Sequence, residues 1–460
     1  MPESPFVKTR SLSLLQLLPI AAFLVLAHGC ADDAVTPTLV LPEPPPDPVL
    51  VWLAANAHPF TGPHLSLPHT ELEFLRELVG DARIVALGEN THGARDFFEM
   101  KARILRFLVE EMGFNTFAIE ATWPEARRID HYVRTGEGDP ERLLSGLYFW
   151  TWNTESVLEM IEWMREHNQA GGDVGFHGFD MQYPGMALHN VREYVRSVDP
   201  EALEAVSEQL ECLQRFANGP NGRSPQPRYS DESDSYRTTC IASLDEAREF
   251  LVSKREEYET AAGEDAFEVA FQSLRVAVQF HLSAAREQGR DESMAENTEW
   301  ISRRIGPEGR MVLWAHNYHV STQPGAQGSY LRETFGDDMV VVGFSHEGGR
   351  FTGVDLEATT YRGLPAFDLD PPMPGSFEAS LARGAASRFV LDLRNRDTSV
   401  LGSSWLVGER LFRSIGCCYR PSMPDRYWRP VPLTEWYDVL IHFEVTRETT
   451  VLPHRPPDSF

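Results

Sequence analysis

The sequence predicts an α/β fold, in which a mostly parallel central sheet is flanked by helices and carries an inserted helical subdomain. Two observations predict this class. From residue 82 onward, short apolar runs alternate with segments whose apolar residues recur at helical spacing, which is typical of a parallel sheet. Between residues 191 and 306, helical spacing continues but strand patterns are almost absent. The chain has 460 residues, enough to bury a large core.

The predicted sheet is built from seven apolar runs, at 82–89, 115–120, 173–180, 310–319, 338–346, 387–394 and 436–445. A helix is predicted over 95–112, because its apolar residues form one face and Gly113 follows as a stop signal. A second helix around 155–168 precedes the third strand. The α/β core is therefore predicted in two parts, 51–190 and 307–460.

The inserted subdomain, predicted over 191–306, is indicated by apolar residues that recur every three or four positions: Phe267, Phe271, Leu274, Val278 and Leu282. Similar patterns cover 200–216, 238–260 and 291–305. We expect these segments to form a group of helices inserted in the α/β core.

The first 30 residues are predicted to be an export segment. Lys8 and Arg10 precede an apolar stretch at 12–27, which is short and interrupted by proline, so a transmembrane anchor is disfavoured. The stretch is followed by a small residue and Cys30, which predicts lipidation of Cys30, with export without a lipid as the alternative. Residues 31–50 are Pro-rich and predicted to form an extended tether. We expect a protein of the bacterial cell envelope, periplasmic or on the outer membrane, that contacts the membrane only through its lipid anchor.

The net charge of −26 argues against nucleic-acid binding, because so acidic a chain repels phosphate backbones. Cys212 and Cys240 flank a polar stretch and could form a disulfide in an oxidising compartment. Cys417 and Cys418 are adjacent, so we expect them to be unpaired and buried. No CxxC pair occurs in the sequence, which gives no support to a structural zinc site.

Polar side chains follow four of the predicted strands at the point where each strand ends. Because the carboxyl ends of parallel strands meet at one edge of a sheet, we expect them to lie together. One such residue alone could be a helix cap or a packed core residue. Four strand ends that all deliver carboxylates or imidazoles favour a functional site, made of Glu89, His92, Glu120, Asp180, His316 and His319.

These residue types are suited to hydrolysis. A histidine can take a proton from water, and a neighbouring carboxylate can fix its tautomer. Further histidines, or Lys101 in the following helix, could stabilise an oxyanion. No GxSxG motif is present, the nearest being "GFSHEG" at 343–348, so attack by water is favoured over a serine nucleophile. No cofactor is predicted; a metal held by the same residues stays open, although HExxH is absent.

Several motifs together resemble the erythromycin esterase family of bacterial hydrolases. They are "GENTHG", "FFEMKARILRFLVEEMGFNTFAIEA", "GFDMQ", "MAENTEW", "WAHNYH" and the final "WYDVLIHFEVTRET". The resemblance spans roughly 80–450. It implies hydrolysis of an ester or lactone, a small-molecule substrate, by water that a histidine activates.

The resemblance also implies roles for individual residues. His92 is the expected base, Glu89 and Glu120 its supporting carboxylates, and the paired histidines fall on His316 and His319. The family's active-site arginine falls on Lys101, a departure that resembles the branch named succinoglycan biosynthesis proteins. Asp180 and Gln182 are expected to contact substrate or brace the base, while Arg290, Asp291 and Asn297 either orient helices over the cleft or serve as helix caps.

The sequence is compatible with three functions. The first is an esterase or lactonase, which could include macrolide hydrolysis. The second is a metal-dependent hydrolase that uses the same residues. The third is a non-catalytic protein that binds envelope polysaccharide or takes part in its biosynthesis, which would bind ligand without His92.

Overall fold

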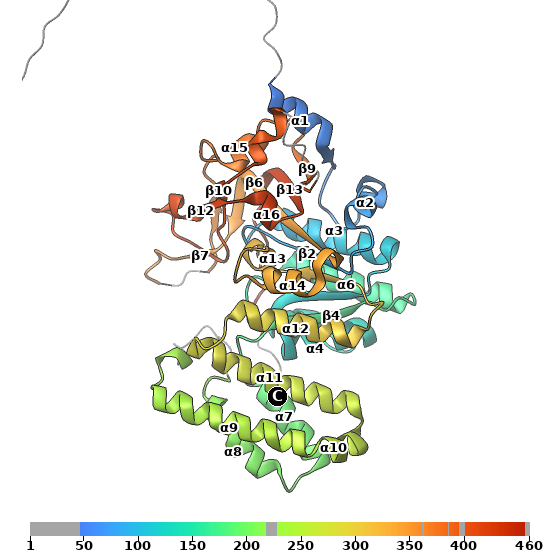
Figure 1. The fold of residues 1–460 in the computed structure, drawn as a ribbon, viewed down its shortest axis with the longest axis vertical. Helices are drawn as coiled ribbons and strands as arrows, with labels where there is room; N and C mark the ends of the chain where they lie inside the picture. The colour runs from blue at the N-terminus through green and yellow to red at the C-terminus, as the bar shows by residue number, and fades with distance from the viewer. Residues whose placement is uncertain (1–46, 218–227, 361–362, 385, 395–400, 456–460) are drawn as a thin grey trace, which may run out of the picture. The chain divides into compact units, whose positions relative to one another are not determined.

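A computed structural model describes residues 47–217, 228–360, 363–384, 386–394 and 401–455. Its centre is a nine-stranded sheet (Figure 1). In spatial order the strands are β1 (Ala57–Pro59), β9 (Arg388–Asp392), β13 (Val439–Thr446), β6 (Met339–Thr352), β2 (Ile84–Leu87), β5 (Met311–Trp314), β3 (Thr116–Thr122) and β4 (Gly175–Asp180), with β8 (Ala366–Asp368) paired to β6.

The strands from β13 to β4 all run parallel to their neighbours, while β1, β9 and β8 add antiparallel pairs. The predicted α/β class is therefore confirmed, and each of the seven predicted runs contains a strand. The fourth run is shorter than predicted. β5 ends at Trp314 because His316 caps the short helix α13 (Asn317–Val320), with its ring accepting the N–H of Tyr318.

Both faces of the sheet are covered, because successive side chains of a strand point to opposite sides. In β2, Ile84 and Ala86 belong to one core and Val85 and Leu87 to the other. The second core is filled largely by α3 (Arg95–Met112), α4 (Trp123–Thr135), α5 (Pro140–Ser145) and α6 (Glu155–Gln169).

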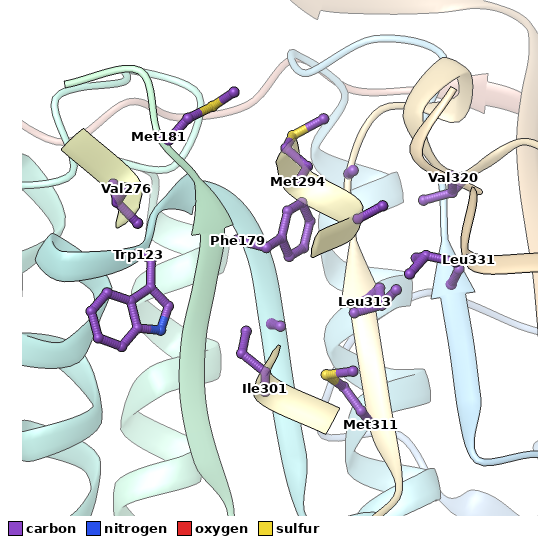
Figure 2. Packing of buried hydrophobic residues seen from close by; sticks show 14 of the residues in the cluster. Trp123, Phe179, Met181, Val276, Met294, Ile301, Met311, Leu313, Val320 and Leu331 are labelled. Atoms are coloured by element: carbon purple, nitrogen blue, oxygen red, sulfur yellow. The ribbon is translucent and has the colours of Figure 1, made fainter. Parts of the chain in front are cut away.

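The first core lies beneath α12 (Arg290–Ile305) and α14 (Gln327–Phe335). In Figure 2, Met294 and Ile301 of α12 face Phe179 of β4 and the strand β5. This packing fixes the first residue of α12, Arg290, near the ends of β3 and β4.

The helices α7 (Gly185–Val198), α8 (Leu203–Gln214), α9 (Asp234–Ser253), α10 (Arg255–Ala262) and α11 (Glu264–Ala285) lie together beyond α12 and β4 (Figure 1). Helical structure thus begins before residue 191, and the pattern at 238–260 covers two helices. The described residues from Asp47 onward belong to one compact unit, so the subdomain limits of 191 and 306 stay a prediction. A disulfide joins Cys212 of α8 to Cys240 of α9.

The predicted tether ends earlier than residue 50. Helix α1 (Pro48–Asn56) already begins at Pro48, and its cap Asp47 accepts the N–H of Val49 at 2.9 Å. The export segment and Cys30 lie outside the described residues. Within the ranges that the structure describes, no helix is both long and apolar enough to cross a membrane.

Besides β1 and β8, four short strands outside the main sheet were not predicted. β10 (Arg410–Arg413) pairs with β12 (Trp428–Val431), and β7 (Val354–Asp355) pairs with β11 (Cys418–Tyr419). They are too short to show an alternating pattern, but they bring residues 414–418 to the edge where β2 ends.

Candidate active site

The loop between β2 and α3 is held by two close backbone contacts. A side chain at Gly88 would collide with Asn317, and one at Gly93 with the backbone of Thr352. The carbonyl of Gly93 accepts N–H groups from Thr352 at 3.0 Å and Thr449 at 2.9 Å. Glycine at both positions therefore lets the loop lie against its neighbours, and Glu89 and His92 lie between these two anchors.

Glu89, His92 and Lys101 form one buried chain. His92 Nδ1 lies 2.9 Å from Glu89 Oε1, and the other oxygen of Glu89 is paired with the Lys101 ammonium. Burial lowers the pKa of Lys101, which the charge of Glu120 opposes, and the ammonium also lies 4.4 Å from the Trp314 ring centroid. Lys101 thus lies beneath the site and contacts Glu89.

Since Glu89 engages Nδ1 of His92, the imidazole's Nε2 is left to face the cavity. Burial is the main cause that lowers the pKa of His92 to about 4, with Glu120 opposing and His319 and Arg290 adding to the decrease. At neutral pH the ring is therefore neutral and able to accept a proton.

Glu120 occupies a point where the β3–β4 register shifts, between Ile119 and Thr122. Its carboxylate accepts Arg290 Nη2 at 2.8 Å and the backbone N–H of His316 at 3.0 Å. Burial alone would raise its pKa, but the charges of His319, Arg290 and His92 lower it, so Glu120 stays ionised.

His319 lies between two carboxylates. Its Nδ1 is 2.7 Å from Asp291 Oδ1 and its Nε2 is 3.3 Å from Glu120 Oε1. Burial lowers the pKa of His319, but Glu120 and Asp291 outweigh that effect, so the net shift is upward. Of the three clustered histidines, His319 is thus the one that takes up a proton most easily.

His316 has a different arrangement. Its Nδ1 accepts the N–H of Tyr318 at 3.1 Å, so the proton of the neutral ring is on Nε2. Burial first, and then His92 and His319, lower its pKa to about 3, with Glu120 and the Asn90 backbone opposing. Nε2 is buried, so the ring presents no exposed N–H to the cavity.

Arg290 links the strand ends. Its guanidinium donates to both oxygens of Asp180, at 3.1 and 2.7 Å, as well as to Glu120. Asp180 is fully buried and also accepts the Gln182 side chain at 2.6 Å. Asp180 positions Arg290 and is not part of the cavity wall, whereas Gln182 does line the cavity, so substrate contact by these two residues stays a prediction.

These residues surround a cavity of about 380 Å³. It is lined by His92, Glu120, Phe149, Thr151, Trp152, Gln182, Arg290, His316, His319, Ile415, Gly416, Cys417 and Cys418. The structure therefore brings together the predicted residues His92, Glu120, His316 and His319, with Glu89 and Lys101 behind His92.

The expectation for Cys417 and Cys418 was wrong on both counts. The two residues form a disulfide with each other, and Cys417 is exposed. The preceding residues contact the β2–α3 loop, since His92 N–H donates to the Gly416 carbonyl at 3.2 Å and Ile415 N–H to that of Asn90 at 2.7 Å. This segment thus forms one wall of the cavity and supports the loop that carries His92.

Ser345, in the motif "GFSHEG", lies outside the cavity wall. It is fully buried between strands, where its Oγ is 2.8 Å from His442 Nδ1, and His442 Nε2 is 2.9 Å from Glu347. The order serine, histidine and carboxylate looks like a nucleophile chain, but a fully buried Oγ gives substrate no access. We interpret this chain as structural.

Metal binding has no preformed set of ligands here. In the parts of the chain that the structure describes, no group of three or more His, Cys, Asp or Glu side chains is placed to hold a metal ion.

Sequence reasoning did not place Arg290 in the site, nor the wall made by residues 415–418. The motif "GRDESMAENTEW" was the signal for Arg290 and Asp291, but helix capping explained it equally well. No sequence signal marked the 415–418 wall.

The erythromycin esterase family model matches residues 109–446, so the chain belongs to this family. Erythromycin esterase type II from Escherichia coli is 24% identical over 371 residues, which cover 74% of this chain and 87% of that protein. Membership of the family supports a hydrolase.

Two crystal structures have a similar fold. A Bacillus cereus protein aligns with a TM-score of 0.77 at 23% identity, over 89% of this chain and 100% of the other. A protein named succinoglycan biosynthesis protein aligns with a TM-score of 0.74 at 24% identity, over 88% of this chain and 98% of the other. At this identity, the likeness is one of fold.

Proposed function

We propose that this protein is an exported hydrolase that cleaves an ester or lactone with water activated by His92. The observation that carries the proposal is a neutral imidazole at a cavity, held through Nδ1 by a buried carboxylate, with the guanidinium of Arg290 in the same cavity wall. Membership of the erythromycin esterase family supports the reaction class.

In the first step, water binds in the cavity next to His92. Nε2 removes a proton from it as the water oxygen bonds to the carbonyl carbon, and the electron pair of the C=O bond moves onto its oxygen. Glu89 stabilises the imidazolium that forms, because its carboxylate accepts the Nδ1–H.

The oxyanion of the tetrahedral intermediate is stabilised by N–H groups on the cavity wall. The guanidinium of Arg290 supplies them, and Arg290 lines the cavity. Glu120 and Asp180 hold Arg290 in place. Donors fixed in this way need little reorganisation as charge develops.

In the second step, the C–O bond to the leaving group breaks. The departing oxygen takes the proton from His92, which returns to its neutral form. An ester gives a carboxylic acid and an alcohol, while a lactone gives one hydroxy acid. No covalent intermediate with the protein forms in this scheme.

Export is part of the proposal, since the first 30 residues have the pattern of an export segment ending at Cys30. A cell-envelope location agrees with the Cys212–Cys240 disulfide, because disulfides persist in oxidising compartments. Palmitate labelling of Cys30→Ala and wild-type cells tests the lipid anchor.

The proposed function is tested with a panel of aryl esters, lactones and macrolides, each incubated with and without a chelator and analysed by mass spectrometry. We expect addition of one water to at least one class of substrate, at the same rate with and without EDTA. Turnover that EDTA abolishes would favour the metal-dependent reaction. Binding of a substrate without hydrolysis, unchanged in His92→Ala, would favour a non-catalytic role.

A further inference from the structure

We propose that a second, larger cavity next to the candidate active site binds the non-reacting part of the substrate, and that this part is a carboxylated sugar. The inference rests on the proposed function and names the substrate class for the same site. It depends on three features of this cavity: its position, its charge and its aromatic wall.

The second cavity has a volume of about 860 Å³ and shares four wall residues with the first, namely His316, Ile415, Gly416 and Cys418. A molecule whose ester lies at His92 and His316 can therefore extend into it. At about 380 Å³, the first cavity is near the lower limit for a ligand pocket, so it suits the reacting group better than a whole large substrate.

The wall of the second cavity is positively charged, whereas the chain as a whole is negatively charged. Arg426 and Arg429 line it, and no Asp or Glu is found among the described residues of its wall. This is unusual in a chain with 68 acidic and 42 basic residues. An anionic ligand would be drawn into this cavity from an otherwise acidic surface.

Both guanidinium groups lack a partner among the residues that the structure describes. Neither Arg426 nor Arg429 has an ion pair or side-chain hydrogen bond with a described residue, and both are exposed. By contrast, Arg290 is bound by two carboxylates. Burial and then the charge of Asp291 raise the pKa of Tyr318, another residue of this wall. The Asp291 carboxylate is itself already bound by His319 and by the backbone N–H of Gln327. A ligand carboxylate could pair with each free arginine through two parallel hydrogen bonds.

The remaining wall suits a ring. It includes the aromatic residues Tyr318, Phe412, Tyr427, Trp436 and Tyr437, with the amide side chain of Gln323 beside them. Tyr318 is 39% exposed, which is high for a large hydrophobic residue, so part of its side chain is open to solvent. Aromatic faces with amide groups beside them can hold the apolar and hydroxyl sides of a sugar.

The backbone that carries these two arginines is held in place by strand pairing and aromatic stacking. Arg429 is part of β12, which pairs with β10, and Tyr427 stacks on Tyr419 at 4.8 Å between ring centroids. The Tyr427 hydroxyl accepts the N–H of Arg420 at 2.8 Å. The positive charges of Arg426 and Arg429 are thus held at a defined place relative to the first cavity. A site that selects one substrate class requires such fixed positions.

The test compares two probes that differ by one carboxylate: 4-nitrophenyl β-glucuronide and 4-nitrophenyl β-glucoside. Binding of each to the full chain is measured by calorimetry, and release of acetate is measured from their O-acetyl esters. We expect the glucuronide to bind about tenfold more tightly and its ester to have a correspondingly higher kcat/KM. The binding preference should weaken as salt is added.

The variant Arg426→Gln/Arg429→Gln should reduce the preference ratio to about one, since both charge-assisted contacts are lost. Arg303→Gln is the matched control, because Arg303 is an exposed arginine of α12 that does not line this cavity, and it should keep the preference. Equal binding of both probes by the wild type, or a preference that survives the double variant, would overturn the inference.

The binding measurement by calorimetry separates this inference from the proposed function. Hydrolysis of esters without a preference for the glucuronide would leave the hydrolase in place and reject the anionic substrate. A glucuronide preference in binding, without acetate release from any ester, would support the cavity and reject the reaction.

Discussion

His92 and His316 are buried and His319 is largely buried, yet their pKa values shift in opposite directions. Burial favours the neutral form of His92 and His316, and the charge of His319 adds to this effect at both rings, as does Arg290 at His92. His319 contacts Glu120 and Asp291 directly, so its charged form is favoured. One cluster thus provides a base and a cation within a few ångströms.

This difference predicts the pH dependence of activity. His92 must be neutral to accept a proton, and its pKa is lowered to about 4. The value of kcat/KM should therefore fall as pH drops through about 4 and should be level from there towards neutral pH. A pH profile measured with a neutral aryl ester checks this. A rising limb centred on the ordinary histidine pKa of about 6.5 would contradict it.

At the same scale, Arg290 is predicted to be essential for both stability and activity. Replacing it with Met leaves the buried carboxylates of Asp180 and Glu120 without their partner, which should cost about 3–5 kcal/mol of unfolding free energy. Activity should also fall, because one oxyanion donor is lost. Urea unfolding and kcat/KM check the two effects.

Arg303→Gln again serves as the control for loss of an arginine in α12. Its partner Glu299 is partly exposed, so we expect its unfolding free energy to change by less than about 1 kcal/mol. If Arg290→Met were as stable as this control, the role assigned to the Asp180–Arg290–Glu120 group would be wrong.

At the scale of elements, the parallel strands explain why distant residues meet. β2, β3, β4 and β5 lie side by side and point the same way, so their carboxyl ends deliver Glu89, Glu120, Asp180 and His316 to one edge. This could be predicted because each strand is a clear apolar run and each polar residue follows directly.

Other parts of the site come from packing between elements and could not be read from local patterns. Arg290 reaches Glu120 only because α12 packs on β4 and places its first residue at the strand ends. The 415–418 segment reaches His92 through backbone hydrogen bonds, which any sequence can form. The adjacent cysteines gave no indication that they pair.

The Cys212–Cys240 disulfide ties α8 to α9 and should stabilise this group of helices. It closes a loop with a sequence separation of 28 residues, for which loop-closure entropy gives about 3–4 kcal/mol. Replacing both cysteines with Ser should lower the unfolding free energy by this order. Thermal and urea unfolding of the variant and of the oxidised wild type check it.

Reduced wild type is the matched comparison for that variant, since it also lacks the bond. The Cys417–Cys418 pair will be reduced as well, so Cys417→Ser/Cys418→Ser is measured alongside. A double Cys212→Ser/Cys240→Ser variant as stable as the oxidised protein would show that the bond adds nothing to this group of helices.

At the scale of the whole molecule, an acidic protein carries two neighbouring cavities whose walls include basic side chains. Arg290 and His319 line the first cavity and Arg426 and Arg429 the second, in a chain of net charge −26. Composition alone argued against nucleic acid as a partner. Only the folded chain shows that the free arginines and the catalytic candidates lie along neighbouring cavities.

The central claim is that His92 is the base that activates water. The most direct test compares kcat/KM of wild type and His92→Ala on an ester that the wild type cleaves, with His131→Ala as the control because His131 is an exposed histidine of α4. We predict a loss of about 10²–10⁴-fold in His92→Ala, with folding intact, and no loss in the control. Equal activity of His92→Ala and wild type would contradict the account.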